Sequence, residues 1–353
     1  MSGRLVRLAC TAAVAAQAAL APAAPAAAVP EPEPRQPSVS RLLTDLQQLY
    51  QQAEQATETY NGTTEKLAAQ RAEVSRLDGE LARARLALRD SQGDAGRLAR
   101  QQYQSGDGLG PYVRLLLAPD PQHALDEGHV IGELARERAR TVARLAGTEK
   151  RQDVLARAAR KALDAQLSLA DRQRKQRDEV RGRLADVERM LASLTPDQLA
   201  AVARLEQQGV TEAQQRLTTS GALPADRPAS AEGGRAVRYA MDQLGKPYEW
   251  GAEGPGAYDC SGLTSEAWSH AGTPIPRTSQ EQWQRLRRVP LRELRPGDLV
   301  VYFPQATHVA LYVGGGKVVQ APRPGARVQV SPLASYPVLG AVRPDGGQAT
   351  EAR

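Results

Sequence analysis

A heptad repeat dominates the first half of the chain and restricts that half to long paired helices. Steps of four and three residues from Leu42 meet mostly apolar or small side chains, while the positions between them are charged or glutamine. A stripe of this period that continues for about six heptads is typical of a coiled coil. The positions are Leu42, Leu46, Leu49, Ala53, Ala56, Tyr60, Thr63, Leu67, Gln70, Val74, Leu77, Leu81, Ala84 and Leu88.

The repeat is interrupted once and then resumes. Glycine and proline are frequent between Ser105 and Pro121, and a second helical pattern extends from about Leu125 to Leu194. Two arms of similar length around a break predict an antiparallel hairpin, at residues 40–217 with its tip at about 104–122. Two coils that pair between separate chains are the alternative. The apolar run Leu109–Leu117 has two interpretations: a docking site for a partner, or an internal cap packed on the hairpin.

The last third of the chain has the composition of a globular domain. Large aromatic side chains, which dominate burial in cores, are concentrated there. A linker rich in Ser, Pro, Gly and Ala at 218–234 precedes a predicted α+β domain at 235–345, which a tail follows at 346–353. We expect helices at 235–244 and 260–271, and strands at 298–303, 308–313, 317–320, 327–330 and 338–343.

The N-terminus has the pattern of a secretory signal. Arg4 and Arg7 precede an Ala-rich apolar run, and Ala26-Ala27-Ala28 offers a cleavage site, so we expect a signal peptide at 1–28 and a Pro-rich linker at 29–39. Removal of the signal takes Cys10 with it. Cys260 is then the only cysteine of a secreted protein, with no partner for a disulfide.

Cys260 and His308, one thiol followed along the chain by one imidazole, suggest a thiol nucleophile with a histidine base. A cysteine that begins a helix is favoured as the thiolate, with a pKa as low as ~3.5–7.5 in such surroundings. A three-residue turn at Gly314–Gly316 would pair Val313 with Lys317 and Ala310 with Gln320, so that Gln320 could orient the imidazole. The alternatives are an inert buried thiol and a structural histidine at a strand end.

The last third of the chain contains a succession of short motifs. In order along the chain, they are Gly245-Lys246-Pro247-Tyr248, Asp259-Cys260-Ser261-Gly262-Leu263, Pro276-Arg277-Thr278-Ser279, Arg295-Pro296-Gly297-Asp298-Leu299, His308-Val309-Ala310-Leu311-Tyr312-Val313-Gly314 and Gln320-Ala321-Pro322. These motifs resemble those of the NlpC family of papain-like cell-wall endopeptidases.

The resemblance assigns an expected role to each site residue. It implies that Cys260 is the nucleophile, that His308 is the base, and that the third polar residue is Gln320, where relatives often have His, Asn or Glu. Tyr248 matches the tyrosine that lines the site and helps to bind the oxyanion. Asp259 and Ser261 match residues that contact the substrate near its acidic residue or free amine.

The same resemblance implies hydrolysis of the bond between γ-D-glutamyl and the diamino acid in peptidoglycan stem peptides. The helical region resembles the coiled coils of secreted wall hydrolases that close the cleft or dock on a membrane activator. A non-catalytic wall-binding scaffold and a related thiol amidase or acyltransferase are the alternatives.

No cofactor is implied, because thiol hydrolysis needs none. We expect no metal site, since His123 and His129 have no cysteine nearby. The formal net charge is +6, but the Lys and Arg residues form no block interleaved with aromatic residues, so no nucleic-acid partner is expected.

Overall fold

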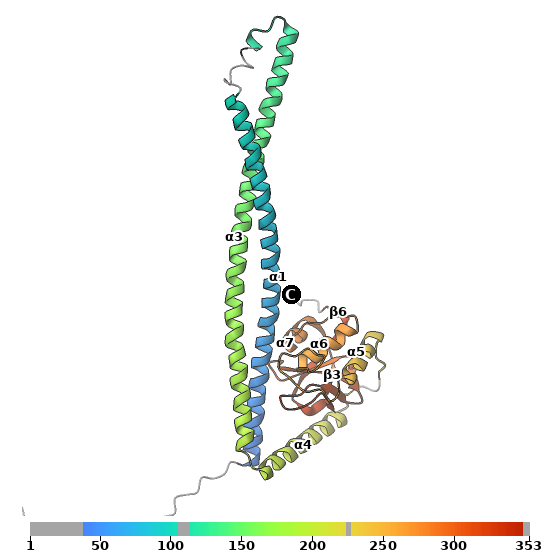
Figure 1. Ribbon diagram of the computed structural model, residues 1–353. Helices are drawn as coiled ribbons and strands as arrows, with labels where there is room; N and C mark the ends of the chain where they lie inside the picture. The colour runs from blue at the N-terminus through green and yellow to red at the C-terminus, as the bar shows by residue number, and fades with distance from the viewer. Residues whose placement is uncertain (1–37, 105–112, 114, 224–226, 349–353) are drawn as a thin grey trace, which may run out of the picture. The chain divides into compact units, whose positions relative to one another are not determined.

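The computed structural model describes residues 38–104, 113, 115–223 and 227–348. Two long helices fill the first half: α1 (Val39–Gln104) and α3 (Pro121–Ser193), which run side by side in Figure 1. Residues later in α1 contact residues earlier in α3. Gln70 donates to the Ala162 carbonyl at 3.0 Å, and Gln173 donates to Thr64 at 2.9 Å. The two helices are therefore antiparallel within one chain, and the predicted hairpin is confirmed.

The heptad positions form the contact between the two helices. Leu77 and Leu81 are buried with Ala159 and Ala162 in one cluster. Nearer the open end of the hairpin, Leu42 and Leu46 pack with Val187 and with Val202 of α4 (Pro196–Thr219). The signal peptide, nearly all of the Pro-rich linker, and residues 105–112 and 114 of the predicted tip lie outside the described residues.

Capping residues set the helix ends. Asp120 accepts hydrogen bonds from the backbone N–H groups of Gln122 and His123, both at 2.9 Å, and so begins α3. Thr195 and Gln198 form a capping box that begins α4 directly after α3 ends. Among the described residues, no helix is both long and apolar enough to span a membrane.

The C-terminal domain contains a six-stranded antiparallel sheet in the order β1-β6-β2-β3-β4-β5. This arrangement, together with the hairpin in front of it, confirms the predicted α+β fold class. The strands are β1 (Leu286–Val289), β2 (Leu299–Tyr302), β3 (His308–Gly314), β4 (Lys317–Gln320), β5 (Gln329–Pro332) and β6 (Val338–Gln348).

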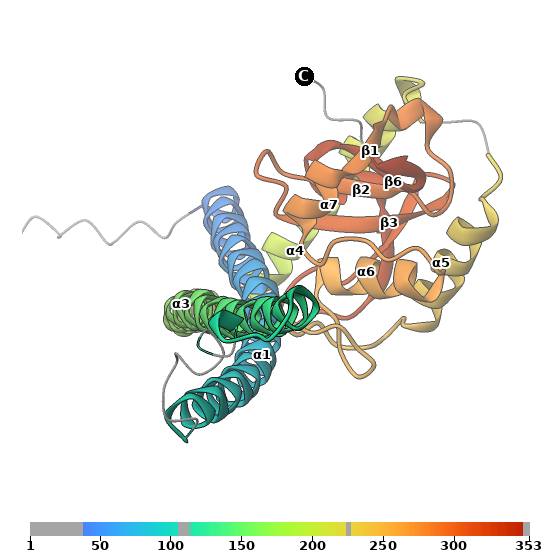
Figure 2. The same ribbon diagram turned by 90° about the horizontal axis from the view of Figure 1, so that it is seen from above.

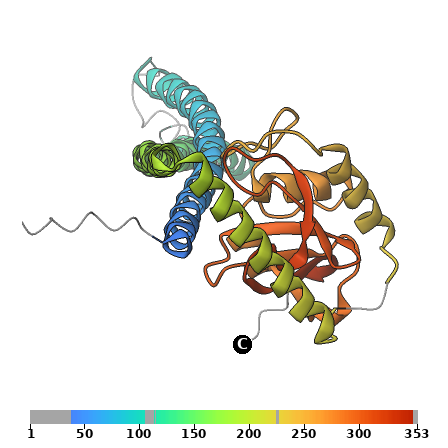
Figure 3. The same ribbon diagram turned by 90° about the horizontal axis from the view of Figure 1, so that it is seen from below.

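Alternate residues of the strands face two different layers. Leu299, Val309 and their same-face neighbours pack against α5 (Ala231–Asp242) and α6 (Cys260–His270), which lie along one side of the sheet in Figure 2. Val300 and Ala310 face the other way, toward the short helix η2 (Leu333–Ser335) and Leu217 of α4. Figure 3 shows α4 crossing this second face of the domain.

Three details differ from the sequence-based expectations. The strand β1 and the short helix α7 (Ser279–Arg285) that precedes it were not predicted. The helix α5 begins inside the expected linker, capped by Ser230. The predicted pairing of Val313 with Lys317 is wrong, because a bulge places Gly314 opposite Lys317. Beyond the bulge, Leu311 pairs with Val319, so the rest of the hairpin keeps the expected register.

Candidate active site

Cys260 is the first residue of α6, and the preceding residue fixes its place. The Asp259 carboxylate caps the helix by accepting from the Gly262 N–H at 2.7 Å. Gly262 is required there, since a Cβ at this position would lie 2.3 Å from the Ala252 carbonyl oxygen. The Asp-Cys-Ser-Gly order therefore encodes a capped helix start pressed against the loop before it, with the thiol at the positive end of the helix.

His308 begins β3, and the hairpin to β4 brings Gln320 to it. The distance from His308 Nε2 to Gln320 Oε1 is 2.7 Å, and both side chains are buried. The rings of Tyr302 and Tyr336 lie 5.6 Å and 5.0 Å from the imidazole, between ring centroids, and limit its rotation. With Nε2 donating to the glutamine oxygen, Nδ1 is the nitrogen left to accept a proton.

The thiol lies against the same strand. The backbone N–H of Val309, the residue after His308, hydrogen-bonds to Cys260 and favours its thiolate. Burial nevertheless raises the pKa of Cys260 well above its ordinary value, and the carboxylates of Glu58, Asp259 and Glu54 raise it further. The expected lowering of this pKa is therefore wrong for the cleft as the structure shows it, because α1 covers the thiol and brings carboxylates to it.

A buried ion pair lies beside the cysteine. Arg277 Nη2 contacts Asp259 Oδ2 at 2.7 Å, and Arg277 Nη1 donates to Asp259 Oδ1 at 3.1 Å and to Ser261 Oγ at 2.8 Å. Gly251 N–H also donates to Asp259 Oδ2, at 2.9 Å. Asp259 thus holds the helix start and Arg277 together, and Ser261 presents its hydroxyl from the first turn of α6.

Tyr248 lies at the edge of the same site. Its side chain is 6% exposed, and its backbone N–H donates to the Ala326 carbonyl at 2.9 Å. Burial raises the pKa of Tyr248 well above its ordinary value, and the charge of Cys260 is the next largest cause. The phenol therefore stays protonated close to the sulfur, where it can donate a hydrogen bond.

Comparisons with known proteins place this domain in a family. Residues 245–339 match the NlpC/P60 family. A probable endopeptidase of Corynebacterium glutamicum is 43% identical over 116 residues, which cover 33% of this chain and 56% of that protein. This chain thus spans little more than half the length of that relative.

A second relative matches along almost the whole chain. A probable endopeptidase of Mycobacterium tuberculosis is 31% identical over 349 residues, which cover 85% of this chain and 89% of that protein. The chain belongs to the NlpC/P60 family. The peptidoglycan endopeptidase RipA of Mycobacterium tuberculosis is 34% identical over 111 residues, 28% of this chain and 24% of that protein.

In this member of the NlpC/P60 family, α1 inserts polar side chains into the site. Glu54, Glu58 and Asn61 are each at most 5% exposed, although they belong to a helix outside the sheet domain. Glu58 Oε1 accepts from Ser261 Oγ at 2.7 Å and lies 3.9 Å from Cys260 Sγ. Glu58 Oε2 accepts from the Ser279 N–H at 2.6 Å and the Ser279 hydroxyl at 2.9 Å.

The two neighbours of Glu58 on this helix face contact the rest of the site. Glu54 Oε1 lies 3.4 Å from His308 Nδ1, without hydrogen-bond geometry. Asn61 Nδ2 donates to Asp259 Oδ2 at 2.9 Å. Burial lowers the pKa of His308, but the Glu54 carboxylate outweighs it together with Gln320, so this pKa is raised above its ordinary value.

The structure brings every predicted site residue together. Cys260, His308, Gln320, Tyr248, Asp259 and Ser261 are all buried and lie together where the start of α6 meets β3 and β4. Sequence reasoning missed Glu54, Glu58 and Asn61. They repeat at four and three residues, directly beside the heptad seam, but a polar stripe of this kind is normally a solvated helix face.

Proposed function

We propose that this chain is a cysteine endopeptidase of the cell wall, gated by its own helical hairpin. It cleaves peptidoglycan stem peptides between γ-D-glutamyl and the diamino acid. Membership of the NlpC/P60 family and the names of the relatives, probable endopeptidase and peptidoglycan endopeptidase, support the reaction class. The observation that carries the gating is the insertion of Glu58 between Ser261 and Ser279, beside Cys260.

The reaction follows from the two sides of the imidazole. Gln320 holds Nε2, and Nδ1 takes the thiol proton while Sγ of Cys260 attacks the peptide carbonyl. Tyr248 donates to the oxyanion. The imidazolium then protonates the leaving amine, the peptide C–N bond breaks, and a thioester remains. Water, deprotonated by His308, hydrolyses the thioester and restores the thiol.

The inserted face of α1 offers the groups that a bound substrate would offer. Family resemblance assigns Asp259 and Ser261 to the acidic residue or free amine of the stem peptide. In the closed cleft, α1 supplies one group of each kind: the Glu58 carboxylate accepts from Ser261, and the Asn61 amide donates to Asp259. A stem peptide and α1 compete for the same donors and acceptors, so the chain is inactive until α1 leaves.

The closed cleft also disfavours the chemistry itself. A thiol with a raised pKa supplies little thiolate, and the Glu54 carboxylate beside His308 raises the pKa of the imidazole and so favours the form that cannot take the thiol proton. Departure of the helix removes both carboxylates at once. The expected pKa of a thiol at a helix N-terminus beside an imidazolium is then regained.

A secreted location and an external activator complete the proposal. The N-terminal signal pattern directs the chain outside the membrane, to the cell wall. Near the predicted tip, Leu116, Leu117 and Leu125 are 83%, 75% and 74% exposed. An apolar surface of this kind suits a membrane-bound activator that grips the hairpin and draws α1 away from the cleft.

The test compares full-length variants on purified peptidoglycan. Glu54→Lys/Glu58→Lys, hereafter the opened chain, places two cations against His308 and Arg277, and should release new amino groups much faster than the unmodified chain. The matched control is Glu137→Lys/Glu149→Lys, which makes the same charge change at exposed positions of α3. Mass spectrometry of the fragments identifies the bond that is cut.

Three results would each contradict a part of the proposal. If the opened chain still releases amino groups after Cys260→Ala, the thiol is not the nucleophile. If the opened chain is no faster than the unmodified chain, α1 does not gate the activity. If both chains cleave peptidoglycan at the same measurable rate, the chain is an enzyme that lacks this gate. Fragments cut at another bond indicate an amidase or acyltransferase instead.

A further inference from the structure

The inserted face of α1 gives an order to the groups along the cleft, and this inference rests on the proposed function. Tyr50, Glu54, Glu58 and Asn61 follow one another at four, four and three residues, so they form one line along the helix. The line is about 16 Å long at 1.5 Å per residue, which is the length of roughly five extended peptide residues.

Each residue of this line meets a different group of the catalytic domain. Tyr50 lies under the guanidinium of Arg323, with 4.7 Å from Cζ to the ring centroid. Glu54 meets His308, and Glu58 meets Ser261 and Ser279. Arg323 and Ser261 therefore lie on opposite sides of His308 along the cleft.

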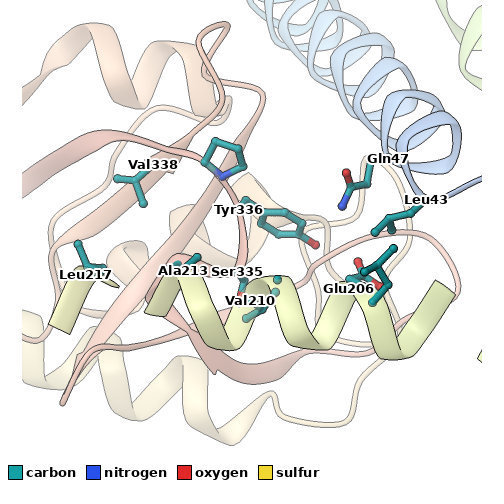
Figure 4. Close-up of a pocket in the computed structure, with 13 residues that line it drawn as sticks. Leu43, Gln47, Glu206, Val210, Ala213, Leu217, Ser335, Tyr336 and Val338 are labelled. Carbon is teal, nitrogen blue, oxygen red and sulfur yellow. The ribbon is translucent and has the colours of Figure 1, made fainter. Parts of the chain in front are cut away.

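The partners of Arg323 come from the helical region. Its Nη1 contacts Oε1 of Glu206 in α4 at 2.8 Å, and its Nη2 contacts Oε2 at 3.2 Å, so the pair is a two-pronged fork. Arg323 also borders a cavity of about 180 Å³ with Glu54, Phe303 and Tyr336. Figure 4 shows the neighbouring pocket, which shares Gln47, Glu206, Ser335, Tyr336 and Pro337 with this cavity, and there Tyr336 points toward Gln47 of α1 and Glu206 of α4. When the helices leave, both the carboxylate and the aromatic ring leave Arg323.

We propose that Arg323 binds a carboxylate on the leaving half of the stem peptide, and that Glu206 occupies that site in the closed chain. The acyl half of the substrate is assigned to the side of Ser261 and Asp259, so the diamino acid and the residues after it extend toward Arg323. A guanidinium fork recognises a carboxylate in the geometry that Glu206 now has. The preferred diamino acid accordingly carries a free carboxylate on its side chain or at the peptide terminus.

The experiment measures kcat and KM of the opened chain with matched synthetic stem peptides. One has a diamino acid with a side-chain carboxylate and an amidated terminus, and a second has the side-chain carboxamide. A third has lysine with a free terminus, and a fourth has lysine with an amidated terminus. These arms separate a side-chain carboxylate from a terminal one.

In the opened chain, Arg323→Gln should raise KM roughly 10- to 100-fold for the peptide that carries the recognised carboxylate, since a charge-assisted hydrogen bond is lost. The peptides without a carboxylate should be unaffected. Arg323→Lys, which keeps the charge without the fork, should be intermediate. In the unmodified chain Arg323→Gln should have the opposite effect and increase activity, because it removes contacts with Tyr50 of α1 and Glu206 of α4 that help to hold α1 over the site.

Arg292→Gln, an exposed arginine of the same domain, is the control and should change none of these values. If the Arg323 variants change the kinetic constants of all four peptides equally, Arg323 does not bind the substrate carboxylate. This conclusion holds even if Arg323→Gln activates the unmodified chain, since a residue that only fastens α4 would also give that activation. An opened chain that cleaves no peptide and no peptidoglycan refutes the proposed function instead. Thermal melting of each variant establishes that it is folded.

Discussion

Closure of the cleft by α1 should weaken as the pH rises from 5 to 8. Burial, together with the Asp259 carboxylate, raises the pKa of Glu58 from its ordinary value of 4.5 to about 7. An acid whose pKa is raised by closure takes up a proton when the cleft closes. The closed state is therefore favoured most below pH 4.5 and loses this advantage progressively up to pH 7.

The size of the effect follows from these two pKa values. The ratio of closed to open chains should fall roughly 70-fold between pH 5 and pH 8, equivalent to about 2.5 kcal/mol. His308 acts in the same direction. Its pKa is raised by Glu54 in the closed cleft, so its contribution to closure is present below pH 6.5 and is lost as the pH rises through the raised value.

The assay is the turnover of peptidoglycan by the full-length chain across this pH range, divided by that of Glu58→Gln at each pH. Both proteins share the same chemical step, and the amide cannot titrate. The ratio of the two turnover rates thus reports the protonation of Glu58 alone. It should rise by one to two orders of magnitude from pH 5 to pH 8.

Glu137→Gln, an exposed site on α3, should give a quotient that does not change with pH. A Glu58→Gln quotient that stays constant within a factor of two would show that Glu58 is not buried and protonated in the inactive chain. A quotient that falls with pH would show that the carboxylate closes the cleft in its ionised form.

Substitutions at three further positions test the site. Cys260→Ala should lower hydrolysis at least about 10³-fold, with a melting temperature near that of the parent. Gln320→Ala should lower kcat of the opened chain roughly 10- to 100-fold, because the imidazole becomes free to rotate. Gln320→Glu should raise the pKa of His308 and move the acidic limb of the pH–rate profile to higher pH. An acidic limb that does not move would contradict the contact between His308 and Gln320. Arg277→Gln leaves Asp259 without its cation and should reduce the free energy of unfolding by about 3–5 kcal/mol in urea, so an unchanged midpoint would contradict the buried pair.

The helical hairpin and the contact between His308 and Gln320 could both be predicted from the sequence, for related reasons. The heptad seam is a local pattern, and Leu77 and Leu81 are buried where it places them. The contact between His308 and Gln320 depends only on the short hairpin between them, and the register survives the bulge at Gly314. Turn residues and strand periodicity are sufficient to place such pairs.

Other parts of the domain have weaker local signals. Leu286–Val289 forms the edge strand β1 although two arginines stand at its centre, since an edge strand can leave both of them exposed. By its local sequence, Arg277 suits a turn and the cleft equally well, and the structure places it in a buried pair with Asp259. The choice between these roles depends on a contact across 18 residues of chain.

The sequence by itself determined the helical hairpin, the α+β domain and the identity of the thiol and imidazole, because each follows from a periodicity or a short motif. Only the tertiary structure decided which face of α1 enters the cleft. Glu58 and Ser261 are 203 residues apart, and nothing near Glu58 distinguishes it from the solvated glutamates of the same helix. Its burial follows from complementarity with hydroxyl and N–H donors of another domain, and such complementarity has no period that a sequence can display.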